Sequence, residues 1–253
     1  MESLSKAKLK LFASLQQKKY RYEHALFLVE GKKLVMEAAG SAWPLECVII
    51  NDAREEALGA VLGELSSVPT FSLNEREFKK LSTQVSSEGI LAVARMPHTQ
   101  VWPIEEHSSA LLLERVNDPG NLGTLLRTAD WFGIHRVYCT SDTVDVYNPK
   151  VLRSSMGAFF RVEFTYVDEW DSFIQQHQNR IWLADMEGVS VKNHTFKKGD
   201  WILLGNEASG VSLETRNSLP DRKLTIEGSG KGESLNVGVA GGIFLYHLFM
   251  GNS

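Results

Sequence analysis

The chain is organised around one stretch late in the sequence, Ile226–Phe249, which reads IEGSGKGESLNVGVAGGIFLYHLF. The stretch begins at the end of a predicted strand and passes through a glycine-rich loop into an apolar helix. Glycine in such a loop can adopt a positive φ and lets a ligand come close to the backbone. From Val237 onward, apolar residues fall on nearly every face of the helix, which predicts that the helix is buried.

Three glycines interrupt this helix, at Gly238, Gly241 and Gly242. Each costs a helix about 1 kcal/mol relative to alanine, so we expect close backbone packing to offset the cost. Ser234, Leu235 and Asn236 stand where the helix should start, and free N–H groups there point into the loop. The alternative is an ordinary buried helix with an N-cap. The phosphate-binding loop of NTPases is excluded, because glycine follows Lys231 where that motif requires Ser or Thr.

Composition indicates an ordinary globular protein of one or two domains, with 253 residues, 43% of them hydrophobic and 23% charged. No apolar run approaches the roughly 18 residues of a membrane span. The first residues, MESLSKAKLKLF, have neither the apolar core nor the cleavage site of a signal peptide. Cys47 and Cys139 lack motif spacing, so we expect buried free thiols in a reducing compartment. These features predict a cytoplasmic protein without a membrane partner.

The charge of the chain is unevenly distributed. The formal net charge is −4, which alone argues against a nucleic-acid partner, but residues 1–33 hold eight Lys or Arg and only three Glu. Such a local basic patch attracts phosphates whatever the overall charge. The alternative is a solvated helix face.

The first part of the chain alternates between short apolar strands and helices, which predicts a small α/β domain over residues 1–97. The expected strands are 26–29, 47–50, 70–71 and 90–94, and the expected helices are 4–19, 32–39, 53–65 and one that Asn74 caps. Residues 97–109, PHTQVWPIEEHSS, contain two prolines and no clear period. We therefore expect a linker at 98–108.

The remainder, residues 109–253, predicts a second α/β domain with a mainly parallel sheet. Its first strand, Ala110–Leu113, is a continuous apolar run, as is typical of a parallel sheet covered on both faces. Further strands are expected at 136–139, 164–167, 181–184, 201–204 and 224–226, and helices at 125–132, 149–159 and 169–178.

Three loops follow apolar strands of this second domain, at 117–123, 205–210 and 227–234. In open α/β sheets ligands bind at the carboxyl ends of the strands, so these loops should meet at one end of the sheet. With the helices that they open, they offer Asn121, Arg127, Glu207, Ser234 and Asn236. One carboxylate and one fixed cation do not suit paired-carboxylate chemistry. No His, Cys or Asp cluster has metal-ligand spacing, so no metal is expected. The sequence also lacks a G-x-S-x-G elbow, and the Gly205 loop is not G-x-G-x-x-G, so dinucleotide binding has little support.

Three segments of the second domain resemble the signatures of the SpoU, or TrmH-like, RNA 2′-O-ribose methyltransferases of the SPOUT superfamily. They are NDPGNLGTLLRTADWFGI, LLGNEASGVS and ESLNVGVAGGIFLY, and their order and separation also match. The segment NPKVLRSSMGAFFRVEF is similar to the family as well. In the first domain, FLVEGKKLVMEA and SSEGILAVARM resemble the small substrate-binding domain of rRNA-directed members, which is similar to ribosomal-protein-type RNA binders.

The resemblance implies an α/β sheet whose C-terminal segment passes through a loop to make a trefoil knot, which is otherwise very rare in proteins. It implies S-adenosylmethionine as the cofactor and a homodimer as the working unit. The residues at the positions that contact the cofactor are Gly205, Ile226 and Leu235, followed by Leu204 and Ala184. The family commonly has proline after the strand isoleucine, whereas Glu227 follows Ile226 here.

The resemblance also implies roles for the polar residues. Arg127 matches the catalytic arginine, which is proposed to act as the base or its activator. Because a guanidinium stays protonated in proteins, we prefer that it grips the target phosphate and polarises the 2′-hydroxyl. Asn121 would hold Arg127 and its loop, and Glu207 would orient the Gly205 loop or the arginine. Ser234 and Asn236 would shape the cofactor and ribose pocket.

RNA contacts are expected from Arg153, on the helix after Pro149, and from Lys32 and Lys33 in the first domain. Each of the polar site residues also has an ordinary structural interpretation: a surface arginine, a turn-forming asparagine, an exposed glutamate or a helix cap.

The expected function is therefore S-adenosylmethionine-dependent 2′-O-methylation of a ribose in RNA. The additional first domain favours large-subunit, 23S-type rRNA as the substrate. The alternatives are a tRNA 2′-O-methyltransferase and a non-catalytic RNA-binding or ribosome-assembly protein with the same fold. The sequence does not name the nucleotide, because proteins recognise RNA by shape and single-stranded context.

Overall fold

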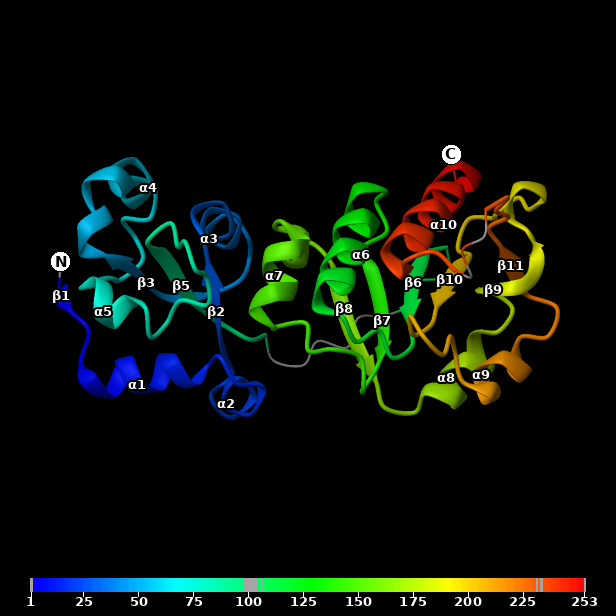
Figure 1. Cartoon of the computed structure of the whole chain (residues 1–253), viewed down its shortest axis with the longest axis horizontal. Coiled ribbons are helices and arrows are strands. Elements are labelled where there is room, and N and C mark those ends of the chain that lie inside the picture. The colour runs from blue at the N-terminus through cyan, green and yellow to red at the C-terminus, as the bar shows by residue number, and fades with distance from the viewer. Residues whose placement is uncertain (1, 98–103, 106, 231, 233, 253) are drawn as a thin grey trace. The chain divides into compact units, whose positions relative to one another are not determined.

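The computed structural model describes residues 2–97, 104–105, 107–230, 232 and 234–252, which form two units that each contain one sheet (Figure 1). The first unit combines residues 1–100 with 145–160, and the second combines 101–144 with 161–253. The segment 145–160 therefore packs with the first unit, although neighbouring residues on both sides belong to the second.

The first unit contains a five-stranded mixed sheet in the order β1-β4-β3-β5-β2. Strands β1, β3 and β4 run parallel, whereas β5 is antiparallel to both β2 and β3. The strands are β1 (Glu2–Ser3), β2 (Leu26–Glu30), β3 (Leu45–Asn51), β4 (Thr70–Leu73) and β5 (Ile90–Arg95). The helices are α1 (Lys6–Ser14), α2 (Lys18–His24), α3 (Lys32–Ala39), α4 (Gly59–Glu64), α5 (Glu75–Phe78) and α7 (Pro149–Ser155), with short 3₁₀ turns η1 (Asp52–Arg54), η2 (Glu56–Leu58) and η3 (Ala158–Phe160).

The single helix predicted over residues 4–19 is two helices, α1 and α2, with a break around Leu15. The physical reason is Arg21, whose Nη1 donates to the carbonyl oxygens of Leu15 and Gln16, both at 2.9 Å. The same guanidinium pairs with Asp145 and is only 3% exposed. Arg21 is therefore not available to phosphates, and the basic patch predicted over residues 1–33 contains one cation fewer than the sequence suggests.

The second unit is built on a six-stranded sheet in the order β11-β9-β10-β6-β7-β8, and every neighbouring pair is parallel. The prediction of a mainly parallel sheet is thus confirmed. Its strands are β6 (Ala110–Leu113), β7 (Arg136–Thr140), β8 (Glu163–Val167), β9 (Ile181–Ser190), β10 (Trp201–Leu204) and β11 (Lys223–Thr225). Its helices are α6 (Pro119–Trp131), α8 (Trp170–His177), α9 (Leu213–Ser218) and α10 (Val237–Asn252), with the 3₁₀ turn η4 (Val191–Asn193).

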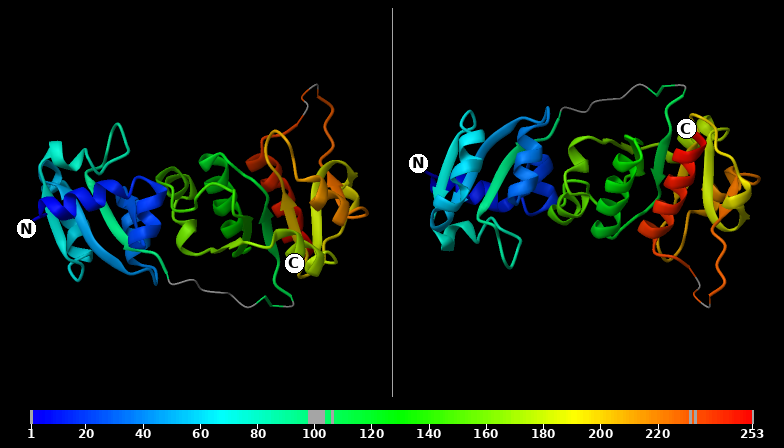
Figure 2. Two further views of the ribbon diagram at one scale, coloured as in Figure 1. Left: turned by 90° about the horizontal axis from the view of Figure 1, so that it is seen from below. Right: turned by 90° about the horizontal axis from the view of Figure 1, so that it is seen from above.

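Helices cover both faces of this sheet. α6 and α10 pack side by side over one face, and α8 and α9 lie against the other (Figures 1 and 2). The central strands β6 and β10 are buried along their whole length, which explains their unbroken apolar sequences. Trp201, Tyr138 and Ile174 belong to the core between the sheet and α8.

Helix α6 begins at Pro119, six residues before the start predicted from the apolar pattern. Asp118 is its N-cap, and its side chain accepts a hydrogen bond of 2.9 Å from the backbone N–H of Asn121. Proline suits the first helical turn because its missing N–H would be unpaired there. Asn121 therefore lies in the first turn of a helix rather than in a turn-rich loop.

Helix α10 is not buried on all sides, contrary to the prediction from its apolar sequence. One face packs on the protein through residues such as Phe244, Leu245 and Leu248. The other face exposes apolar side chains to between 41% and 55%, namely Val239, Tyr246, Phe249 and Met250. The apolar pattern shows which faces of the helix are hydrophobic, but it does not show whether the same chain covers each of them.

Both cysteines are free and buried, as predicted. Within the described part of the chain, no helix combines the length and the apolar character that a bilayer-spanning segment requires.

Candidate functional site

The candidate site of the second unit lies where segments from three strands meet. β6 leads into the start of α6, β10 leads into the loop 205–210, and the chain beyond β11 leads into α10. Because the strands are parallel, the sheet brings their carboxyl ends to one edge. The three segments are then joined by side-chain hydrogen bonds.

A line of three polar side chains connects these segments. Nδ2 of Asn236 donates to Oδ1 of Asn121 at 3.0 Å, and Nδ2 of Asn121 donates to Oε1 of Glu207 at 2.9 Å. Asn236 also caps α10, since its Oδ1 accepts from the backbone N–H of Gly238 at 2.9 Å. We call Asn236, Asn121 and Glu207 the polar line. It fixes the direction of the Glu207 carboxylate relative to the two helix starts.

The loop 205–210 is a closed turn. The N–H of Asn206 donates to the carbonyl of Gly210, and the N–H of Gly210 donates back to Asn206, both at 2.9 Å. Oδ1 of Asn206 accepts from the N–H groups of Ala208 and Ser209 at 3.0 and 3.1 Å. A Cβ on Gly205 would lie 2.4 Å from the carbonyl carbon of Gly210, so only glycine fits there. The loop therefore has one well-defined shape.

Two of the three glycines predicted to pack closely, Gly238 and Gly241, allow α10 to approach α6 and β10, whereas a Cβ on Gly242 would meet only Thr128, at 3.9 Å. A Cβ on Gly241 would lie 2.2 Å from Leu125 Cδ2 and 2.9 Å from Leu204 Cδ1, and a Cβ on Gly238 would lie 3.3 Å from Thr124. This is the close packing that the sequence predicts. It holds the start of α10 against the start of α6, and so it keeps Asn236 within reach of Asn121.

Four of the five residues expected to contact a cofactor lie at or beyond strand ends, and Ala184 lies inside β9. Leu204 is the buried last residue of β10, and Gly205 follows it. Ala184 lies within β9, one position beyond Leu183, which pairs with Leu203. Ile226 directly follows β11 and is half-buried, and Leu235 is 49% exposed just before α10. No described hydrogen bond joins Ser234 or Leu235 to the polar line.

Arg127 lies on α6, six residues after Asn121, which is roughly 9 Å further along the helix axis. Its side chain is exposed. No hydrogen bond or ion pair to another described residue holds it, so the structure does not join it to Asn121 or Glu207. A guanidinium in this state can bind a phosphate without first breaking an ion pair.

The three residues expected to contact RNA all belong to the first unit. Lys32 and Lys33 are exposed at the start of α3, and the N–H of Lys32 donates to Oε2 of Glu88 at 2.7 Å. Arg153, on α7, donates from Nη1 to Oγ1 of Thr83 at 2.7 Å. From its position in the sequence, Arg153 was predicted to belong to the second domain. Its helix α7 instead packs against β2 of the first unit.

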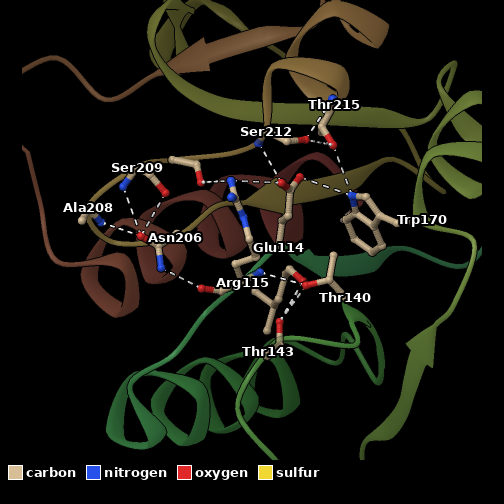
Figure 3. Close-up of polar contacts among 12 residues, drawn as sticks. Glu114, Arg115, Thr140, Thr143, Trp170, Asn206, Ala208, Ser209, Ser212 and Thr215 are labelled. Atoms are coloured by element: carbon tan, nitrogen blue, oxygen red, sulfur yellow. Dashed lines mark hydrogen bonds and ion pairs between the residues drawn. The ribbon is translucent and has the colours of Figure 1, made fainter.

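Three residues that shape the loop 205–210 were not among the site residues predicted from the sequence. Glu114 and Arg115 follow β6 directly, and the side chain of Asn206 organises the loop from within (Figure 3). The sequence does contain a pattern that could have indicated Glu114 and Arg115. Two charged residues directly follow the apolar run Ala110–Leu113, at the carboxyl end of a strand, where ligand sites of such sheets lie.

Among the described residues, no group of three or more His, Cys, Asp or Glu is arranged to hold a metal ion.

Comparison with known families finds two matches along the chain. The model of the SpoU rRNA Methylase family matches residues 108–246, and that of the MRM3-like substrate binding domain matches residues 6–92. The two matches cover most of the sequence and do not overlap.

Two curated relatives extend over most of the chain. The 23S rRNA (guanosine(2553)-2′-O)-methyltransferase RlmP of Bacillus subtilis is 30% identical over 98% of each protein. The 23S rRNA (uridine(2479)-2′-O)-methyltransferase of Streptomyces viridochromogenes is 29% identical over 87% of this chain and 81% of that relative.

Solved structures with the same fold also cover nearly the whole chain. The SpoU methyltransferase AviRb from Streptomyces viridochromogenes, in complex with AdoMet, has a TM-score of 0.85 at 26% identity, over 97% of this chain and 98% of that one. A TrmH-family structure from Porphyromonas gingivalis has a TM-score of 0.82 at 32% identity over the same shares of the two chains.

Proposed function

Because this chain belongs to the SpoU rRNA methylase family, we propose that it transfers the methyl group of S-adenosylmethionine to a ribose 2′-hydroxyl of RNA. We propose large-subunit rRNA as the substrate, since two relatives that cover most of the chain carry 23S rRNA 2′-O-methyltransferase names. The observation that carries the proposal is the polar line, which joins three strand-end segments at one edge of a parallel sheet.

The residues around the polar line fit an adenosine-type cofactor. Position 205 has no room for a side chain, and Leu235 and Ile226 offer exposed or half-exposed apolar surface. We propose that these residues, with Leu204 and Ala184, hold S-adenosylmethionine. When bound, the cofactor supplies an electrophilic methyl group on a good leaving group, so the protein mainly has to position the ribose and assist proton removal.

We propose that Arg127 grips the phosphate next to the target ribose and polarises the hydroxyl. Its exposure and its freedom from described partners support this role. A guanidinium gives up its proton only at high cost, so we prefer positioning to general base catalysis. In this scheme Asn121 and Glu207 set the relative position of α6 and the 205–210 loop. Asn236, with Ser234, shapes the pocket beside them.

The first unit is proposed to bind the RNA substrate. Lys32, Lys33 and Arg153 are cations of that unit, and contacts of this kind to phosphates orient an RNA without reading its sequence. The match of residues 6–92 to a substrate-binding domain supports the same role. Along the sequence, we propose 1–97 as the RNA-binding domain, 98–108 as a linker and 109–253 as the methyltransferase domain, from which residues 145–160 pack in the first unit.

We further propose that the protein is a cytoplasmic homodimer. The exposed apolar face of α10 supports a second copy as its cover, because contiguous apolar surface on a soluble protein usually marks an interface. Trp131, 83% exposed at the end of the neighbouring helix α6, would extend it. Free buried thiols suit the cytoplasm. We also propose that the segment after β11 passes through a loop of the same domain as a trefoil knot.

Two measurements test the proposed function. Calorimetry with S-adenosylmethionine should detect binding to the purified protein, and mapping of 2′-O-methyl groups in cells that lack the protein should reveal one lost site in large-subunit rRNA. A lost site in tRNA instead would change the substrate class. Absence of both cofactor binding and any lost methyl group would leave a non-catalytic RNA-binding or assembly role.

A further inference from the structure

Glu114 and Arg115 form hydrogen bonds with residues that flank the loop 205–210 and with Asn206 and Gly210 near its two ends (Figure 3). The backbone N–H of Glu114 donates to the carbonyl of Leu204 at 2.9 Å, just before the loop. Its carboxylate Oε1 accepts from the backbone N–H of Ser212 at 2.7 Å, just after the loop. Glu114, the residue that directly follows β6, thus bonds to the chain just before and just after the loop.

The carboxylate of Glu114 is buried, with 2% of the residue exposed. Its Oε2 accepts from Trp170 Nε1 at 3.2 Å, and Arg115 Nη2 lies 3.4 Å from its Oε1. Removing a carboxylate from water is unfavourable unless donors and a cation replace the lost hydration. These partners come from α8, the N-terminal end of α9 and Arg115, so Glu114 ties the loop to both helices on that side of the sheet.

Arg115 adopts a left-handed backbone conformation, with φ of +57°. Such a conformation costs free energy for any residue other than glycine, and it is found where surrounding contacts enforce it. Here its N–H donates to Thr140 Oγ1 at 2.9 Å, and its carbonyl oxygen accepts from Asn206 Nδ2 at 2.8 Å. The guanidinium Nη2 lies 3.4 Å from the carbonyl of Gly210. The unfavourable conformation therefore places the Arg115 carbonyl oxygen where it accepts a hydrogen bond from Asn206, the residue that organises the loop.

We propose that Glu114 and Arg115 are positioning residues that give the loop 205–210 the shape required to bind the cofactor and to present Glu207 to Asn121. This inference rests on the proposed function of the loop as part of the cofactor site. Neither residue needs to touch the cofactor. Their effect passes through Leu204, Asn206, Gly210 and Ser212, and from there to the polar line.

The sharpest test is Arg115→Gly, because glycine adopts a positive φ without strain. If Arg115 served only the stability of the fold, this change would leave cofactor affinity unaltered. If Arg115 is a positioning residue, the dissociation constant for S-adenosylmethionine should rise roughly tenfold, as expected for loss of charged hydrogen bonds. The melting temperature should also fall, because the variant leaves the buried Glu114 carboxylate without its cation. A lower melting temperature with wild-type affinity for the cofactor would overturn the positioning role.

Glu114→Gln provides a second variant with nearly the same shape. Its amide retains one acceptor but loses the charge that pairs with Arg115 and cannot accept from both Trp170 and Ser212. Hydrogen exchange of the backbone amides of residues 205–212, measured without cofactor, should accelerate in both variants, while exchange in β6 and β7 stays as in the wild type. Ala25→Gly is the matched control: Ala25 also has a positive φ, of +50°, but it lies in the first unit.

Unchanged exchange in residues 205–212 in both variants would overturn the positioning role, as would faster exchange with wild-type cofactor affinity. Wild-type protein that fails to bind S-adenosylmethionine would instead overturn the proposed function. The exchange measurement decides between these cases, because it requires no cofactor.

Discussion

At the scale of single residues, Asn121 connects the site because a side-chain amide carries both a donor and an acceptor. Its Oδ1 accepts from Asn236 and its Nδ2 donates to Glu207, so one residue joins segments that are 86 and 115 positions away in the sequence. Aspartate could not donate to Glu207, and leucine could make neither bond. The identity of this residue therefore follows from the two partners that it has to join.

Arg127→Ala tests the role proposed for the exposed arginine. We expect methyl transfer to fall at least about a hundredfold, the usual scale for a positioned catalytic group, with little change in cofactor affinity. Because Arg127 is exposed and lacks described partners, the melting temperature should stay close to that of the wild type. Single-turnover methyl transfer and calorimetry give the two numbers. Full activity of the variant on its cognate RNA would show that the arginine is dispensable.

The hydroxyl of Tyr147 should make the folded protein less stable at high pH. Burial, reinforced by the neighbouring Asp145, raises the pKa of the Tyr147 hydroxyl to about 12. In the unfolded chain the same group ionises near pH 10. Between these values the unfolded state loses a proton that the folded state retains, so the free energy of unfolding should fall as pH rises from about 10 to about 12.

Urea unfolding of Tyr147→Phe, measured from pH 8 to 12, checks this expectation. The variant should lose less stability over this range than the wild type, because phenylalanine has no proton to release. Tyr20→Phe, at a tyrosine that stacks on the exposed His24, serves as the control. Identical pH profiles for Tyr147→Phe and the wild type would contradict the assignment.

At the scale of elements, the contact between α6 and α10 decides the geometry of the site. Both helices start at the edge where the polar line lies, and Gly241 lets α10 pack directly on Leu125 and Leu204. Asp118 caps the start of α6, and Pro119 occupies its first turn. Both residue types are typical of helix starts in a sequence. The apolar period, which begins later, gave the wrong boundary because the first turn of α6 is polar.

Gly241→Ala should destabilise the protein although alanine is the better helix former. A Cβ would lie within 3 Å of two buried leucines, and overpacking of this kind typically costs about 1–3 kcal/mol. Chemical denaturation should show a lower free energy of unfolding. Gly63→Ala is the control, because Gly63 is helical, exposed and free of close neighbours. There the same change should stabilise by up to about 1 kcal/mol. Equal effects at both positions would exclude close packing as the cause.

At the scale of the whole molecule, the exposed apolar face of α10 is the feature that a single chain does not explain. Helix α10 is apolar throughout, yet four of its large side chains are at least 41% exposed. Burial of apolar surface is the main driving force for association, so a second copy is the cover that we propose.

Tyr246→Glu should separate the proposed dimer into monomers, because the introduced carboxylate would have to be buried in an apolar interface. Analytical ultracentrifugation of the purified variant measures the change in mass. Leu213→Glu is matched in chemistry, since Leu213 is 70% exposed on α9, and it should leave the mass unchanged. A wild-type protein that sediments as a monomer at micromolar concentration would remove the basis for the proposal.

The sequence by itself determined the α/β class, the parallel sheet of the second unit and a set of five polar candidates, from which the structure joins Asn121, Glu207 and Asn236. Those features follow from local patterns: unbroken apolar strands, glycine-rich turns and polar residues at strand ends. Only the tertiary structure decided that residues 145–160 pack with the first unit, that Glu114 and Arg115 hold the 205–210 loop, and that α10 leaves one face uncovered. Each of these three features depends on contacts between residues far apart in the chain. A local sequence pattern does not show which distant surface a side chain packs against.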